Sequence, residues 1–151
     1  MPPVTVREAT GGDFAGLLRL LDQMDESMYR GRGHAGEGDI RALYQGILAD
    51  KDQRLLVAED GVRIVGSAHV MVLRHLGRSL SRSAVVEGVV VDAGYRRKGV
   101  GAALMRAAAE AAREAGCYKL ALTSNAARPA AHRFYSRLGW KRTHYGYSLE
   151  L

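Results

Sequence analysis

A chain of 151 residues and 16.4 kDa has the length of one domain, and such a domain buries roughly two-thirds of the surface that its unfolded form exposes. Apolar residues make up 47% and charged residues 25%, which excludes a disordered or fibrous chain. The 22 Lys and Arg outnumber the 16 Asp and Glu, so anionic partners are favoured, but the positive residues are too scattered for a nucleic-acid module. We therefore expect a single folded domain over residues 1–151.

Cysteine usage and the N-terminus bear on where the protein works. Cys117 is the only cysteine, so no internal disulfide can form, and we expect a cytoplasmic protein in which this thiol is a core residue. The first ten residues lack the pattern of an export signal, and no apolar stretch is long enough to cross a bilayer. Neither export nor membrane insertion is expected.

The N-terminal third is expected to hold a short strand and two helices. Residues 4–7 have the pattern of a strand, and residues 10–13 resemble a turn that leads into a helix. Residues 31–38 contain four glycines and predict a mobile loop. Asp39 is then expected to cap a second helix. The apolar positions of the two helices are Phe14, Leu17, Leu18 and Leu21, then Ile40, Leu43, Tyr44, Ile47 and Leu48.

The rest of the chain alternates strands with helices. Residues 55–73 predict a hairpin, because the Asp60-Gly61 pair favours the tight turn between antiparallel strands. Residues 84–91 are almost continuously apolar, which is typical of a central strand covered on both faces. Further expected elements are a helix over 99–115, a buried strand over 120–123, a helix over 129–138 and a strand pair over 140–151. The order indicates a mixed α/β domain with a largely antiparallel sheet.

One segment, between the strand that ends at Val91 and the helix that begins near Gly99, has the features of a phosphate site. A helix start offers unpaired backbone N–H groups and a partial positive charge, and glycines let a ligand approach the main chain closely. Three basic residues precede this helix start, namely Arg96, Arg97 and Lys98. The alternative is that Gly99 and Gly101 only permit a tight turn, with the basic side chains in solvent.

Two common nucleotide motifs do not fit this segment. A P-loop needs Lys and Ser or Thr where Val100 and Gly101 stand. A dinucleotide fingerprint needs a small residue at Leu104 and a position near the start of its domain. Both interpretations are excluded by spacing.

Two stretches of the chain resemble signatures of the GNAT family of N-acetyltransferases. Residues 96–101 resemble the R/Q-x-x-G-x-G/A signature, and residues 125–140 are similar to the N-x-x-A-x-x-F-Y-x-x-x-G-F segment, with Trp140 in place of Phe. The resemblance covers roughly residues 55–145. It implies a mixed α/β fold with a largely antiparallel sheet of six to seven strands, a V-shaped splay, and about four helices.

The resemblance also implies a coenzyme A site. The pyrophosphate would lie on the loop and helix start, and Val89, Val90 and Val91 would offer main-chain groups to the pantetheine arm. Asn125 would bind the same arm or cap the helix that begins near Pro129, and His132 would contact the phosphates or face solvent. The loop residues so implied are Arg96, Arg97, Lys98, Gly99, Val100, Gly101 and Ala102.

Two residues are candidates for proton transfer. Glu87 lies on an apolar strand, where a carboxylate is costly unless the strand lines a cleft, and burial there would make it a better base. An ion pair with a nearby Arg or Lys is the alternative, and Gly88 beside it indicates a bulge, a close ligand or simple packing. Tyr135 matches the family's proton donor to the departing sulfur, and its alternative is a packed helix face.

The expected acceptor is the primary amine of a small molecule. Residues 86–92 resemble the glucosamine-phosphate acetyltransferases, whereas residues 131–135 resemble the aminoalkylphosphonate acetyltransferases. We expect direct transfer from acetyl-CoA in a ternary complex, no metal, and a homodimer. The alternatives are an inert acyl-CoA sensor, a protein or peptide N-acetyltransferase, and a basic nucleotide or nucleic-acid binder. No known motif matches residues 24–38, so the acceptor cannot be named from them.

Overall fold

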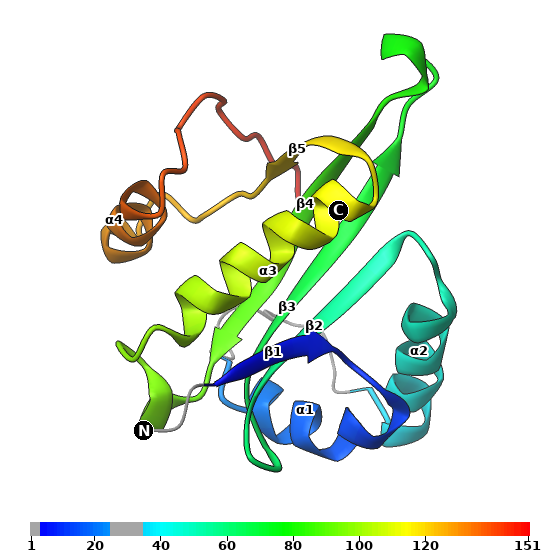
Figure 1. The fold of residues 1–151 in the computed structure, drawn as a ribbon, viewed down its shortest axis with the longest axis vertical. Coiled ribbons are helices and arrows are strands. Elements are labelled where there is room, and N and C mark those ends of the chain that lie inside the picture. The colour runs from blue at the N-terminus through cyan, green and yellow to red at the C-terminus, as the bar shows by residue number, and fades with distance from the viewer. Residues whose placement is uncertain (1–3, 25–34) are drawn as a thin grey trace. The chain divides into compact units, whose positions relative to one another are not determined.

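The computed structural model describes residues 4–24 and 35–151, and the chain forms two compact units, residues 1–121 and 122–151. Each unit is described by itself. The first unit holds the sheet and three α-helices (Figure 1). Its elements are β1 (Thr5–Glu8), η1 (Gly11–Asp13), α1 (Phe14–Leu21), α2 (Glu37–Ala49), β2 (Gln53–Asp60), β3 (Arg63–Arg74), η3 (Arg78–Leu80), β4 (Arg82–Val91), η4 (Ala93–Tyr95), α3 (Val100–Glu114) and β5 (Cys117–Ala121).

The strands of the sheet follow chain order, from β1 to β5. Neighbours from β1 to β4 are antiparallel, and β5 runs parallel to β4. The predicted hairpin is confirmed: Asp60 pairs with Arg63, and Gly61 takes the positive φ of 60° that its turn requires. The result is a mixed α/β fold with a largely antiparallel sheet, as expected.

The helices cover the two faces of the sheet. A Cβ added at Gly66 would lie 2.9 Å from a Leu104 methyl carbon of α3. The next residue, Ser67, lines a pocket with side chains of α1 and α2. Because successive residues of a strand point to opposite faces, α3 covers one face, and α1 and α2 cover the other. Sequence reasoning missed the close approach at Gly66, which sets the distance between β3 and the start of α3.

Strand β5 pairs only with the first part of β4. Their pairs run from Arg82 with Cys117 to Val85 with Ala121, and the second half of β4 has no partner on β5. Beyond Val85 the main chain of β4 makes no pair with β5, and the carbonyl of Val91 accepts a hydrogen bond of 3.4 Å from Arg96. The unpaired part of β4 lies where the family resemblance implies a V-shaped splay.

Several expectations about strands are wrong. The described residues form five strands rather than six to seven, and residues 140–151 form neither helix nor strand. An alternating pattern makes a strand only where a neighbour pairs with its backbone, and these residues have no such neighbour in the described chain. Their apolar side chains are exposed: Tyr145, Tyr147, Leu149 and Leu151.

Burial of the central strands is also less complete than expected. The strand expected over 120–123 is β5, which begins earlier, at Cys117, and is half-buried to exposed. Strand β4 mixes buried, half-buried and exposed positions instead of being covered throughout. Cys117 is half-buried rather than a core residue, and burial raises the pKa of its thiol.

The start of α2 differs from the prediction. Residues 31–34 of the expected mobile loop lie outside the described residues, and Glu37 and Gly38 already belong to α2. The N-cap is Gly36, not Asp39. Asp39 instead shares the first turn with Glu37, where acidic side chains interact favourably with the helix dipole.

The second unit contains one helix, α4 (Pro129–Arg137), which matches the predicted helix over 129–138 to within one residue. Proline lies in its first turn, where a missing backbone N–H costs nothing. Before it, the Asn125 side chain accepts a hydrogen bond of 2.9 Å from the amide of Ala127. The peptide therefore turns sharply just ahead of the helix.

Candidate functional site

A buried carboxylate, Asp92, fixes the point where β4 ends and the basic loop begins. One of its oxygens accepts hydrogen bonds from Arg19 (3.1 Å), Gln23 (3.2 Å) and Arg63 (3.0 Å). The other accepts from the amide of Gly94 at 3.0 Å. The Arg63 hydrogen bond, followed by that of Gly94, holds the pKa of Asp92 well below its ordinary value. Asp92 thus ties α1 and β3 to the loop, a role that sequence reasoning missed.

The basic loop carries two left-handed backbone positions before α3. Arg97 has a φ of 60° and Gly99, the N-cap of α3, has a φ of 82°. The first helical hydrogen bond runs from the amide of Ala103 to the carbonyl of Gly99 at 3.0 Å. Within the described chain, the amides of residues 97–102 donate no hydrogen bond of ordinary length and angle. A cluster of unsatisfied donors at the start of a 15-residue helix is suited to an anion.

The side chains around these amides add positive charge. Arg96, Arg97 and Lys98 are all exposed. Lys98 donates a hydrogen bond of 2.8 Å to the carbonyl of Gly94, and its ammonium lies 5.4 Å from the centre of the Tyr95 ring. The residues present therefore fit a diphosphate, which needs both amide donors and cations.

A bulge interrupts β4 beside Glu87. Ser67 pairs with Val90 and His69 pairs with Glu87, so Gly88 and Val89 both lie opposite one residue of β3. Gly88 has a φ of 59°, which glycine adopts without strain. Of the three interpretations of Gly88, the bulge is confirmed.

The bulge sets the direction of Glu87. Residues directly opposite each other in an antiparallel pair share a face, so Glu87 and His69 both lie on the face that α1 and α2 cover. The expectation that Glu87 is buried is wrong, because the bulge lifts it into an exposed position. Within the described residues Glu87 makes no ion pair, so the alternative role in a structural ion pair finds no support there.

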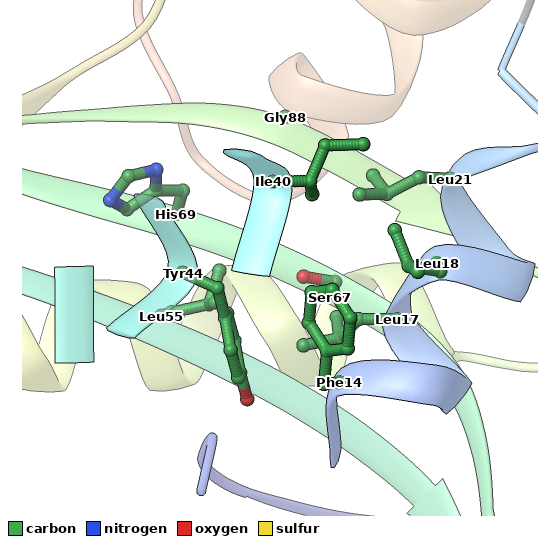
Figure 2. A pocket seen from close by; sticks show the side chains of 10 residues that line it. All are labelled: Phe14, Leu17, Leu18, Leu21, Ile40, Tyr44, Leu55, Ser67, His69 and Gly88. Carbon is green, nitrogen blue, oxygen red and sulfur yellow. The ribbon is translucent and has the colours of Figure 1, made fainter. Parts of the chain in front are cut away.

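A cavity of about 180 Å³ lies on the same face, between α1, α2 and the strands. Figure 2 shows Leu18 and Leu21 of α1 opposite His69 of β3, and Gly88 of the bulge also lines the cavity. The cavity therefore borders the bulge that carries Glu87. Its lining residues are Phe14, Leu17, Leu18, Leu21, Ile40, Tyr44, Leu55, Ser67, His69 and Gly88.

His69 is the one ionisable side chain besides Tyr44 among the described residues that line this cavity. Its Nε2 is buried and has no hydrogen-bond partner in the described chain. Burial lowers the pKa of His69, although Glu87 opposite it acts in the other direction. The imidazole is therefore neutral at pH 7, and its Nε2 is shielded from solvent. Spacing alone left the role of His69 open.

In the second unit, the structure brings Asn125 and His132 together. The carbonyl of Asn125 lies 2.9 Å from Nε2 of His132, and the Asn125 side chain bonds to Ala127 rather than capping α4. The capping role considered for Asn125 is therefore wrong. Asn125 is exposed and His132 is half-buried.

Tyr135 lies on α4 within an aromatic cluster. Its ring centre is 5.2 Å from that of Phe134 and 6.1 Å from that of Trp140, whose amide bonds to the Tyr135 carbonyl at 3.0 Å. Burial raises the pKa of the Tyr135 hydroxyl, so that it keeps its proton at neutral pH. Tyr135 can therefore pack in the aromatic cluster and still keep a proton to donate.

Comparison with known proteins identifies the class of this fold and loop. The model of the Acetyltransferase (GNAT) family matches residues 17–140, which include the sheet opening, the basic loop and α4. The chain belongs to the GNAT acetyltransferase family and is an acyltransferase, as expected from its two motifs. None of the helices in the described parts of the chain has the length and apolar character needed to span a bilayer.

Relatives of the chain include acetyltransferases of small amines. It is 34% identical over 128 residues to glucosamine 6-phosphate N-acetyltransferase 1 of Oryza sativa subsp. japonica, covering 83% of this chain and 73% of the relative. It is 28% identical to the aminoalkylphosphonate N-acetyltransferase of Salmonella typhimurium, covering 100% and 94%. A crystal structure described as a transcriptional regulator from Bacillus halodurans C-125 superposes with a TM-score of 0.86 at 35% identity, over 99% and 100% of the two chains.

Proposed function

We propose that this protein transfers the acetyl group of acetyl-CoA directly to the primary amine of a small molecule in a ternary complex. The arrangement of β4 carries the proposal. In the middle of the strand, the bulge beside Glu87 borders the cavity. After the end of the strand, the helix start of α3 carries amides without a hydrogen-bond partner in the described chain. One strand thus connects a place for an amine to a place for a diphosphate.

Coenzyme binding would use three groups of residues. The amides of residues 97–102 and the side chains of Arg96, Arg97 and Lys98 would hold the pyrophosphate. The main chain of Val89, Val90 and Val91 lies beyond the last β4–β5 pair and would meet the pantetheine arm. Asn125 and His132 would add contacts from the second unit. The proposal requires no metal.

The acetyl thioester of acetyl-CoA supplies the electrophilic carbonyl. Glu87 would take the proton of the incoming ammonium, because an exposed, unpaired carboxylate beside the cavity is free to accept it. Tyr135 would give its proton to the departing thiolate, since burial keeps the hydroxyl protonated at neutral pH. As the N–C bond forms and the C–S bond breaks, the nitrogen loses a second proton, which would replace the one that Tyr135 gives to the thiolate, so the net release is the single proton that Glu87 takes up.

The names of the relatives support a small amine over a protein or peptide. Both acceptors named, a glucosamine phosphate and an aminoalkylphosphonate, are small molecules with a primary amine and an anionic group. We further propose that residues 1–151 work as one domain, since the family match extends across both units.

We also propose a cytoplasmic homodimer. The exposed apolar side chains of residues 145–151 support pairing with a second chain, since such a row is costly in water. Sedimentation velocity would test the dimer, and cell fractionation the location.

Thiol release tests the function. With acetyl-CoA and a panel of small amines, the protein should release free coenzyme A thiol in proportion to N-acetylated product. Acetyl-CoA binding without thiol release from any amine or peptide would instead identify a sensor. Failure to bind acetyl-CoA would contradict the proposal itself.

Removing either proton-transfer group should lower turnover and spare coenzyme affinity. Glu87→Gln keeps the shape but cannot accept a proton, and Tyr135→Phe removes the hydroxyl proton, so kcat should fall about 10²- to 10⁴-fold in each. Calorimetric affinity for acetyl-CoA should stay within about twofold of the original. Matched controls are Glu110→Gln, on the exposed surface of α3, and Tyr147→Phe, in the exposed C-terminal segment. Unchanged turnover in either test variant would remove that residue's role.

A further inference from the structure

The cavity beside the bulge is lined almost entirely by hydrocarbon. Of the ten described residues that line it, eight are aliphatic, aromatic or glycine, and Tyr44, one of these, uses its hydroxyl to donate a hydrogen bond to the carbonyl of Thr10. Only Ser67 and His69 present other polar groups. A substrate group that occupies this space would therefore exchange water for apolar contacts.

Among the residues that the structure describes, the two arginines of the helices beside the cavity are engaged with other groups. No Arg or Lys is among the described lining residues. Arg41 of α2 stacks on the Phe14 ring at 4.2 Å and lies 3.5 Å from the Glu37 carboxylate. Arg19 of α1 is paired with Asp92 at 3.1 Å. Phosphate recognition requires such cations or several amide donors, and the described lining offers neither.

The size of the cavity limits what it can hold. A volume of about 180 Å³ equals roughly six water molecules at ~30 Å³ each, enough for a substituent of about six heavy atoms. Pockets for drug-sized ligands usually start at about 300 Å³. A short alkyl or aryl group fits, whereas an oligosaccharide or a folded peptide does not.

One polar point lies at the wall nearest the bulge. Nε2 of His69 is buried without a partner in the described chain, and a buried polar atom left unsatisfied is costly. His69 pairs across the strands with Glu87. An amine at this wall, with its substituent in the cavity, would satisfy Nε2 once the imidazole turns to bring that atom to the cavity surface, and Glu87 lies opposite His69 in the strand pair.

We infer that the acceptor is a small primary amine with an apolar, unphosphorylated substituent, bound in this cavity with its nitrogen at His69. The inference rests on the proposed acetyl transfer and narrows its substrate class. It differs from the acceptors in the names of the relatives, which carry phosphate or phosphonate.

A homologous series of alkylamines tests the inference. From ethylamine to butylamine, kcat/KM for thiol release should rise about fourfold for each methylene that enters the cavity, because burial of one CH₂ is worth about 0.8 kcal/mol. Glucosamine 6-phosphate and 2-aminoethylphosphonate should be poorer acceptors than butylamine. His69→Leu should lower kcat/KM by a similar factor along the whole series, because the amine group is common to all of its members.

A charge introduced at the rim of the cavity gives a second test of the inference. Leu21 lines the cavity but is 39% exposed, so Leu21→Arg should fold normally and lower kcat/KM for butylamine about tenfold. The matched control Leu43→Arg places the same charge on α2 at a 66% exposed position that does not line the cavity, and should leave kcat/KM unchanged. Acetyl-CoA affinity should be the same in both variants.

The outcomes separate the two levels of the proposal. If the phosphorylated amines are acetylated well and the alkylamine series is flat, acetyl transfer stands and the apolar acceptor is overturned. Equal effects of Leu21→Arg and Leu43→Arg would also overturn it. If acetyl-CoA binds but no amine releases thiol, the proposed function fails together with this inference.

Discussion

Replacing Gly99 by valine should weaken acetyl-CoA binding by about a hundredfold, which corresponds to the loss of two hydrogen bonds to a charged group at about 1.5 kcal/mol each. Gly99 is the N-cap of α3 and has a φ of 82°, a conformation that a β-branched residue avoids. To relieve this strain the backbone must rotate, which turns the neighbouring amides away from a common point. Isothermal titration with acetyl-CoA measures the effect.

The opposite end of α3 offers a matched control. Gly116 has a φ of 77°, and no atom lies within 4 Å of an added Cβ at either glycine. Gly116→Val should therefore cost the same stability, roughly 1–2 kcal/mol for a left-handed residue with a side chain, without changing acetyl-CoA affinity. Equal affinities for the two variants would mean that the amides at the start of α3 do not hold the diphosphate.

Replacing Asp92 by asparagine should lower the free energy of unfolding by about 3 kcal/mol. This value is near the lower end of the range for breaking a buried ion pair, because the Arg partners of Asp92 are half-exposed. Only 4% of Asp92 is exposed, and it holds Arg19, Gln23 and Arg63 to the start of the loop. Urea denaturation measures the loss. Asp52→Asn is the control: Asp52 also forms a bidentate pair, with Arg74 at 2.8 and 3.0 Å, but in solvent, so its loss should be a small fraction of that at Asp92.

Acid should remove the contribution of Asp92. Its pKa in the folded protein is depressed below the unfolded value of about 4, so its stabilisation is complete above that pH and is lost as the pH falls below it. The difference in stability between the original protein and Asp92→Asn should therefore shrink as the pH falls below about 4. A difference that is constant with pH would contradict this assignment.

Local patterns predicted most elements well. The hairpin around Asp60 and Gly61 depends on backbone preferences of a few adjacent residues, and the α3 and α4 helices depend on spacing within one helix. The basic loop before α3 was recognised for the same reason. The final strand pair failed because strand formation needs a partner backbone, and no local pattern supplies one.

The candidate site was predicted only in part. The sequence predicted that Glu87 and the basic loop belong to the site. It did not predict the bulge or the exposure of Glu87, because both depend on how β4 pairs with β3. Gly66 and Asp92 were missed as structural positions, and spacing left the role of His69 open. Asp92 bonds to Arg19, which lies 73 residues away in the chain, and such contacts leave no local pattern.

The amino-acid sequence by itself determined the family, the α/β order and the basic loop before α3, because each arises from residues that are neighbours in the chain. Only the tertiary structure decided that the second half of β4 has no partner on β5 and that Glu87 and His69 share a face. It also decided that hydrocarbon from α1 and α2 lines the adjacent cavity. These features depend on strand register and on packing between distant segments, where the burial of apolar surface rather than local preference selects the arrangement.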